Sequence, residues 1–445
     1  MRYLNAAVEP YAAVNPTTLH NKGKENIISA WQQDRYSNGG ASGFVAGVSF
    51  DGGKSWDLSS LPFNRCVSGG LPYDRVTDPW ISFAPDGTAY LSALLINKVN
   101  NTNSAIAAMT SKNGGRSWSK PVIAKADLGP SVLNDKETIT ADPIHSNIAY
   151  MVWTRFKFFP NNQISNPTWF AKTTDGGQTW RSKIIFRPGL DNNTVGSIIV
   201  ANPKNGILHH FFILVINKNG NKTSFILMQT SKDQGETWSK ARVVTPIVLP
   251  ETIAGGTGQD LVGAFSYLSV DIRSSITVTF SPVINPKTGT LYITWEDARF
   301  SDGQITEVAS SFSTDGGQTW SKPTRVNRST GKPAFQPTIG LNDRGIVGIS
   351  YYQFTNQAPT NSLPVHYLFK ASYNGGKSYT NPAITITRPF NMLTAPFVSG
   401  GFFVGDYQGM VTIRDTFYPF FTKVNSKRET DRTNIFVSRI RLPKR

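Results

Sequence analysis

The sequence predicts an all-β protein assembled from one repeated four-stranded unit, and two observations carry that prediction. A short phrase, Ser-x-Asp-Gly-Gly-x-Ser/Thr-Trp, recurs six times in the 445 residues, and runs of alternating apolar residues flank each copy. The aromatic residues that close successive copies lie 58 to 82 residues apart. The copies are SFDGGKSW at 49–56, SKNGGRSW at 111–118, TTDGGQTW at 173–180, SKDQGETW at 231–238, STDGGQTW at 313–320 and SYNGGKSY at 372–379.

The phrase predicts a tight turn between two strands. Runs such as GFVAGVSF precede it, and runs such as SKIIFRP follow it. Asp or Asn opens such a turn through side-chain bonds to the backbone, glycines supply positive φ, and Ser or Thr adds a local bond. We expect the closing Trp to pack between neighbouring hairpins.

Two further strands precede each such hairpin, as in WISFAPDGTAYLSAL and TITADPIHSNIAYMVW, and a seventh pair, MVTIRDTFYPFFTKV, occurs near the C-terminus. Residues 1–445 are therefore predicted to form a single domain, a seven-bladed β-propeller of four-stranded antiparallel blades. The last blade lacks a fourth strand, which MRYLNAA is expected to supply, so that the N- and C-terminal segments close the ring. A six-bladed propeller is the alternative. The extra length at 251–271 predicts a loop at the rim.

Composition narrows the function classes. A formal net charge of +16 favours anionic partners, and because the basic residues are scattered and carry no nucleic-acid motif, nucleic acid is not favoured. The single cysteine, Cys66, excludes an intrachain disulfide framework. No apolar run approaches 18 residues, so no membrane span is predicted. No metal or cofactor is predicted, and the segment MRYLNAAVEP lacks the apolar region of a secretory signal, so either export is absent or a leader has been removed.

Strand direction alternates within each blade, so the phrase turns fall on one face and the starts of first strands on the other. Polar residues gather on that other face, where carboxylates can transfer protons and arginines can clamp an anionic group. The competing interpretation is a network of salt bridges that links the blades. The candidate catalytic residues are Asp78, Asp135, Glu137, Glu296, Asp406 and Tyr407; the candidate substrate-binding residues are Arg35, Arg75, Arg155, Arg273 and Arg299.

The phrase resembles the Asp-box, or BNR repeat, of sialidases and related propellers. The resemblance implies a propeller whose Asp boxes face away from the active site. Sialidases use an arginine triad, a Tyr/Glu nucleophile pair and an Asp acid/base, but their Phe-Arg-Ile-Pro motif is missing here. By position alone, the resemblance assigns the clamp to Arg35, Arg155 and Arg299, the nucleophile to Tyr407 assisted by Glu296, and the acid/base to Asp78. A carboxylate pair of Asp135 or Glu137 with Asp406 is equally open.

The leading hypothesis is a sialidase-like glycoside hydrolase that acts on an acidic glycan at the channel mouth. A non-catalytic glycan- or protein-binding propeller and a polysaccharide lyase are the alternatives. A lyase would need Tyr, His and Arg around a uronate, whereas His209 and His210 fall inside a predicted strand. The expected partner is an anionic carbohydrate, and the expected location is secreted, cell-surface or particle-associated.

Overall fold

The computed structural model confirms an all-β protein, with 54% of residues in strands and 2% in helices. It describes residues 1–97, 103–160, 163–218, 220–250, 264–268, 270–274, 279–328, 331–355, 361–425 and 430–443. No helix in these ranges is long and apolar enough to span a membrane. The predicted rim loop lies largely at 251–263, outside the described residues.

The chain divides into two compact units. Unit 1 comprises Met1–Pro10, Asp34–Gly39 and Pro246–Arg445. Unit 2 comprises Tyr11–Gln33 and Gly40–Thr245. The single domain over 1–445 stays a prediction.

The N-terminal sheet contains two antiparallel meanders joined by one residue pair, Ala41↔Val76. The order is β1-β2-β3-β5-β6-β7-β8, and β4 pairs with β3. The 3-10 helix η1 (Pro16–Thr18) follows β1. The strands are β1 (Ala7–Val14), β2 (Ile27–Arg35), β3 (Ala41–Ser49), β4 (Asp57–Leu61), β5 (Arg75–Phe83), β6 (Ala89–Ile96), β7 (Ser104–Ser111) and β8 (Val122–Asp127).

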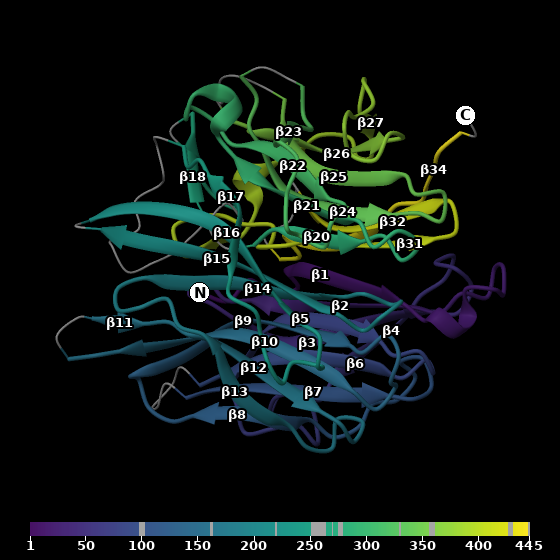
Figure 1. The fold of residues 1–445 in the computed structure, drawn as a ribbon, viewed down its shortest axis with the longest axis vertical. Coiled ribbons are helices and arrows are strands. Elements are labelled where there is room, and N and C mark those ends of the chain that lie inside the picture. The colour runs from purple at the N-terminus through teal and green to yellow at the C-terminus, as the bar shows by residue number, and fades with distance from the viewer. Residues whose placement is uncertain are drawn as a thin grey trace. The chain divides into compact units, whose positions relative to one another are not determined.

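Two further sheets complete unit 2, and each repeats the same meander (Figure 1). One has the order β11-β10-β12-β13 with β9 on β10, and the other has the order β14-β15-β16-β17. The strands are β9 (Val132–Ala141), β10 (Ala149–Phe158), β11 (Ile164–Ser165), β12 (Thr168–Thr173), β13 (Arg181–Phe186), β14 (Asn193–Ala201), β15 (Leu208–Lys218), β16 (Asn221–Ser231) and β17 (Arg242–Ile247).

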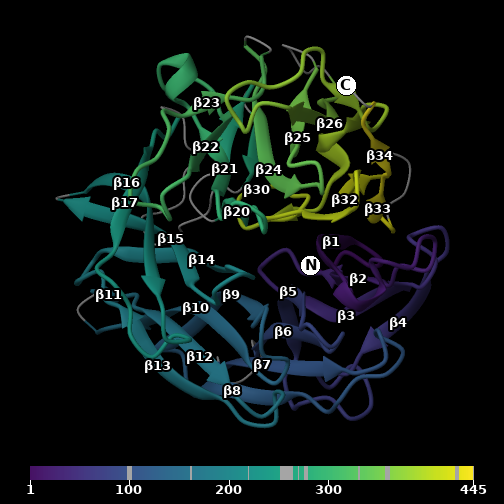
Figure 2. The same cartoon turned by 45° about the vertical axis from the view of Figure 1, so that its right-hand side comes forward.

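Unit 1 contains three sheets of the predicted kind, β20–β23, β24–β28 and β31–β34 (Figure 2). The 3-10 helices η2 (Arg299–Ser301) and η3 (Met392–Thr394) lie in its connections. The strands are β20 (Ser281–Ile284), β21 (Leu291–Asp297), β22 (Glu307–Ser313), β23 (Thr324–Arg325), β24 (Ala334–Leu341), β25 (Val347–Phe354), β26 (Pro364–Ser372), β27 (Ile384–Thr385), β28 (Phe390–Asn391), β31 (Gly409–Ile413), β32 (Thr416–Val424), β33 (Thr433–Val437) and β34 (Ile440–Arg441).

A small sheet that the repeats do not predict also belongs to unit 1. Its order is β18-β19-β30-β29, and the contact between β19 and β30 is parallel, through Ile272↔Phe402. The strands are β18 (Ala264–Tyr267), β19 (Val270–Arg273), β29 (Phe397–Val398) and β30 (Gly401–Phe402). Segments more than a hundred residues apart in sequence are thereby held side by side.

The N-terminal segment is not a strand of the sheet β31–β34. Arg2 forms an isolated antiparallel bridge with Tyr36, and the Asp431 amide donates to the Leu4 carbonyl at 2.9 Å. The sheets are therefore not joined into a closed ring by this segment in the way the sequence predicts.

The phrase turns have the predicted chemistry. In the first copy Asp51 Oδ1 accepts from the Lys54 and Ser55 amides at 2.9 and 3.0 Å, and the Ser55 hydroxyl donates to Oδ2 at 2.6 Å. Gly52 and Gly53 have φ of 74° and 83°, the left-handed conformation that glycine adopts without strain. The closing aromatic residue also packs as expected: the Trp238 ring meets Phe170 of the preceding sheet edge-on at 5.6 Å.

The acidic turns predict a pH-dependent contribution to stability. Hydrogen bonds from the Thr237 hydroxyl and amide lower the pKa of Asp233 to about 2. This contribution is present above the carboxyl's ordinary pKa near 4 and is lost as pH falls from about 4 to 2. Asn113 and Asn374 accept the equivalent bonds from the Ser117 and Ser378 amides at 2.9 and 3.0 Å. Asp233→Asn should therefore lose less stability over this window, as measured by urea unfolding at pH 2 to 6.

The matched control for that substitution is Asp57→Asn, which changes an exposed carboxyl on β4. It should keep the wild-type acid dependence. An unchanged loss of stability in Asp233→Asn between pH 4 and 2 would contradict the role given to this carboxylate.

The buried histidines predict a second acid effect at higher pH. Burial lowers the pKa of His209 to about 4 and that of His210 to about 3. The unfolded chain takes up protons below about pH 6.5 while the folded chain does not, so stability falls as pH drops from 6.5 towards these values. His210→Phe should remove on the order of 3 kcal/mol of the loss between pH 7 and 4, measured by chemical unfolding. His20→Phe, at an exposed position, is the control, and equal pH slopes in the two variants would refute the assignment.

Candidate functional site

The inner strands of four sheets share a β-bulge at the predicted polar positions. In β5, β9, β14 and β24 two residues face a single partner residue on the next strand. The first residue of each bulge is left-handed: Asp78, Lys136, Gly196 and Gln336 have φ of 58°, 56°, 68° and 48°. Glu9 of β1 has φ of 57°. Only one of these five residues is glycine, so the other four hold backbone strain, which clusters at functional positions.

In unit 2 two of these bulges bring charged groups together. Lys136 Nζ lies 3.3 Å from Asp78 Oδ1, and both side chains are buried. Asp135 Oδ1 accepts from the Lys136 amide at 3.0 Å. Glu137, the second residue of its bulge, is 1% exposed, and neither of its carboxyl oxygens has a hydrogen-bond partner among the described residues.

The two buried carboxyls, Asp78 and Glu137, differ in their surroundings. Burial and then the neighbouring Asp78 charge raise the pKa of Glu137 well above its ordinary value. Asp78 instead has the Lys136 ammonium as its ion-pair partner. A buried carboxyl with a raised pKa is a group that general acid chemistry can use.

Arg155 lies in the same unit, but a protein carboxylate engages its guanidinium. Nε and Nη2 donate to the two oxygens of Asp127 at 2.8 and 2.6 Å. Asn134 donates to Asp127 at 3.0 Å and accepts from Trp153 Nε1 at 2.7 Å. Arg75, at the start of β5, is partly exposed. The Arg155 guanidinium, a predicted binding group, is thus part of a hydrogen-bond network with Asp127 and Asn134.

In unit 1 the predicted residues Arg273 and Asp406 form a bidentate pair. Arg273 Nε and Nη2 donate to the Asp406 oxygens at 3.2 and 2.8 Å. The Phe403 ring centroid lies 4.6 Å from Arg273 Cζ and 5.2 Å from Arg35 Cζ, so two guanidinium groups share one ring. The Asp406 amide donates to Glu9 Oε1 at 2.9 Å.

Glu296 is joined to this cluster through Gln336. Its oxygens accept from the Ser274 hydroxyl and from the Gln336 amide, each at 2.8 Å. Gln336 Nε2 in turn donates to the Gly405 carbonyl, next to Asp406. Tyr407 follows Asp406 and is 8% exposed. Glu296 and Asp406 are both fully buried.

Arg299 is held locally. Its Nε and Nη2 donate to Asp297 at 2.9 and 2.8 Å, and Trp295 Nε1 donates to the same carboxylate at 2.6 Å.

The structure groups the candidate residues into two sets. Asp78, Asp135 and Glu137 lie together in unit 2, and Arg35, Arg273, Glu296 and Asp406 lie together in unit 1. The roles assigned to all eleven candidate residues stay predictions.

The structure adds three residues that the predicted site lacks: Lys136, Glu9 and Phe403. A signal for three of the left-handed positions was present, because Glu9, Asp78 and Gln336 each precede proline, which disfavours the right-handed helical conformation of the preceding residue. Phe403 carries no such signal, since it follows the two-residue strand β30, which shows no alternation. Within the described residues no group of three or more His, Cys, Asp or Glu is arranged to hold a metal ion.

A family model matches two segments of the chain. The BNR/Asp-box repeat covers residues 229–240 and 311–322, which are the fourth and fifth copies of the phrase. The chain therefore contains BNR/Asp-box repeats at these two places. The matched segments include the turn residues Asp233 and Asp315, whose carboxylates accept the bonds described above. No curated protein matches the sequence significantly.

Solved structures similar to this Asp-box chain include three glycosidases. An α-L-arabinanase from Penicillium chrysogenum is 11% identical over 98% of each chain, with a TM-score of 0.46. An α-L-arabinofuranosidase from Fusarium graminearum is 14% identical over 79% of this chain and 92% of its own, with a TM-score of 0.49. A Trypanosoma rangeli sialidase is 12% identical over 84% of this chain and 55% of its own, with a TM-score of 0.43.

The close approach of β19 and β30 predicts that Gly401 is indispensable for placing Arg273. A Cβ at Gly401 would lie 2.5 Å from the Arg273 amide nitrogen, which is backbone and cannot rotate away. Gly401→Ala should cost about 1 to 3 kcal/mol of unfolding free energy, measured in urea. Gly43→Ala is the control, because nothing lies within 4 Å of a Cβ there. Equal stability of the two variants would refute the packing argument.

Proposed function

We propose that the chain is a glycoside hydrolase that acts on an acidic glycan. The observation that carries the proposal is the pair of buried carboxyls in unit 2: burial and the Asp78 charge raise the pKa of Glu137 well above its ordinary value, and Asp78 is paired with Lys136. A carboxylic acid kept neutral can protonate a leaving oxygen, and an ionised one can take a proton from water. The net charge of +16 supports an anionic substrate.

In the proposed reaction Glu137 donates its proton to the glycosidic oxygen as the bond from that oxygen to the anomeric carbon breaks. A water molecule bonds to the anomeric carbon and gives a proton to Asp78. The balance is one water consumed and one new hydroxyl on each product. Lys136 acts as a positioning residue that holds the Asp78 carboxylate through their ion pair.

We also propose that the repeated meanders are the blades of a seven-bladed β-propeller. Support comes from the recurrence of four-stranded order in β14-β15-β16-β17 and β20-β21-β22-β23, each with the phrase turn between the third and fourth strands. A six-bladed ring is the alternative. The expected location, secreted, cell-surface or particle-associated, belongs to the same proposal.

A non-catalytic binding protein is the second candidate function, and burial favours it. Asp78 and Glu137 are 3% and 1% exposed, and carboxylates of the protein already engage the forks of Arg155 and Arg299. This candidate predicts glycan binding without product release.

Turnover on a panel of sialosides, uronides and neutral aryl glycosides tests the proposal. Glu137→Gln and Asp78→Asn should each lower kcat by about 10²- to 10⁴-fold, the usual contribution of a positioned acid or base. The rate should fall as pH rises through the pKa of Glu137, because the acid must be protonated, and Glu137→Gln should abolish this limb. Asp343→Asn, at an exposed turn, is the control.

Two outcomes would count against the hydrolase. Turnover that survives in both folded carboxyl variants would refute the assigned residues. Binding to an acidic glycan array with no product from any substrate would favour the second candidate instead.

A further inference from the structure

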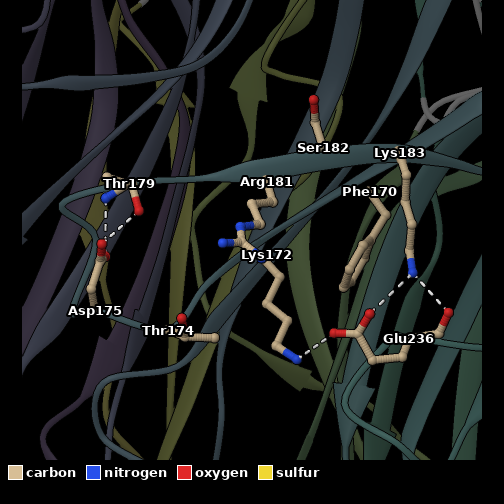
Figure 3. Close-up of a pocket in the computed structure, with 9 residues that line it drawn as sticks. All are labelled: Phe170, Lys172, Thr174, Asp175, Thr179, Arg181, Ser182, Lys183 and Glu236. Carbon is tan, nitrogen blue, oxygen red and sulfur yellow. Dashed lines mark hydrogen bonds and ion pairs between the residues drawn. The ribbon is translucent and has the colours of Figure 1, made fainter.

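A groove with a volume of about 480 Å³ lies beside the third Asp box, on the outer hairpin β12–β13 of unit 2 (Figure 3). Phe170 and Lys172 come from β12, and Arg181 and Lys183 come from β13. Glu236 reaches it from the Asp-box turn that follows β16. A volume of this order is typical of sites that hold a small ligand.

The register of the hairpin places three cations on one face. Lys172 pairs with Arg181, and Phe170 pairs with Lys183. Side chains two residues apart lie on the same face of a strand. These four residues therefore lie together on one face of the hairpin, where one aromatic ring adjoins three positive charges. Like charges directly opposite each other in a sheet are destabilising, so packing alone does not account for the Lys172–Arg181 pair.

Comparison with the other repeats shows that this pair is a departure. The residue that follows the closing aromatic residue is Ser119, Ser239, Ser321 or Thr380 in four other copies. Each of these hydroxyls accepts a hydrogen bond from the backbone amide opposite it, at 3.0 to 3.2 Å. Arg181 stands at this position in the third copy, so a recurring bond is replaced by a cation.

Glu236 shows that the groove accepts a carboxylate. Its Oε1 lies 2.8 Å from Lys172 Nζ and its Oε2 lies 3.7 Å from Lys183 Nζ, while its side chain remains 64% exposed. Asp175, the other acidic residue of the lining, is engaged by its own turn, where the Thr179 hydroxyl donates to it at 2.5 Å. No hydrogen bond or ion pair joins the Arg181 side chain to another residue in the described part of the chain, and this residue is exposed.

We propose that this groove binds the anionic group, carboxylate or sulfate, of an acidic sugar at a site separate from Asp78 and Glu137. Arg181 supplies a planar guanidinium for the anion, and Lys172 and Lys183 supply the remaining positive charge. The cations gather in one short hairpin rather than along a stripe, which favours a single anionic sugar unit over a nucleic-acid backbone. The choice of a sugar as the ligand rests on the proposed function, whereas the anion-binding groove itself does not depend on the chemistry of Glu137.

Calorimetric titration of the full chain tests the proposal. The probes are a chondroitin sulfate hexasaccharide, a galacturonate hexasaccharide that has carboxylates only, neutral maltohexaose and a single-stranded oligonucleotide of similar charge. The wild-type chain should bind one or both acidic sugars and not maltohexaose. A preference between the two acidic probes then distinguishes sulfate from carboxylate recognition.

Three variants are expected to affect the affinity for the acidic sugar in three different ways. Arg181→Ser, which restores the repeat consensus and is expected to fold, should weaken binding at least tenfold. Glu236→Gln, which removes the internal carboxylate, should strengthen binding severalfold. Arg242→Ser, which removes an exposed arginine of β17 in the next sheet along the chain, should leave affinity unchanged.

Equal weakening in Arg181→Ser and Arg242→Ser, absence of binding to both acidic probes, or tighter binding of the oligonucleotide would each overturn the proposal. Turnover separates this site from the proposed hydrolase. Arg181→Ser should keep the turnover of a small aryl glycoside, and Glu137→Gln should keep the affinity for the acidic hexasaccharide. A failed hydrolase assay therefore leaves the binding result standing.

Discussion

Buried charge must be neutralised, and this constraint organises the polar residues of both units. Asp127, Asp406 and Asp297 each take a bidentate arginine, and Asp78 takes the Lys136 ammonium. In two of these pairs the residues come from different strands, as Asp127 of β8 and Arg155 of β10 do, so the same interactions tie these strands together. Glu137 lacks such a partner among the described residues, and its burial raises the pKa of its carboxyl well above the ordinary value. Its surroundings therefore differ from those of the paired carboxylates.

The Asp-box turns satisfy their polar groups in a different way. Each acidic or amide side chain closes its turn with backbone and hydroxyl bonds within a few residues, as Asp51 and Asn113 do. These contacts are local and need nothing from the neighbouring sheet, so the same turn recurs whatever its surroundings. The copies of the repeat can therefore be compared position by position. In this comparison Lys172 and Arg181 are residues that the turn does not require.

The fold was largely predictable because its signals are local and repeated. Strand alternation and turn chemistry located the meanders and the turn at Asp233, and the polar strand starts located Asp78, Glu137 and Asp406. The small sheet β18-β19-β30-β29 was not predictable, because β29 and β30 have two residues each and show no alternation. The pairing of Arg155 with Asp127 was also missed, since sequence spacing does not reveal which carboxylate meets a guanidinium in space.

Strain at the bulges depends on this stable scaffold. Glu9, Asp78 and Gln336 adopt a left-handed conformation directly before proline, and such residues cost about 1 to 3 kcal/mol each. Each is held by a specific bond: Glu9 accepts from the Asp406 amide, Asp78 pairs with Lys136, and the Gln336 amide donates to Glu296. Relaxing a bulge would therefore break a buried polar contact and leave a charge unpaired. The backbone strain persists because breaking the buried polar contact would cost more free energy than the strained conformation does. These polar groups therefore remain fixed in position.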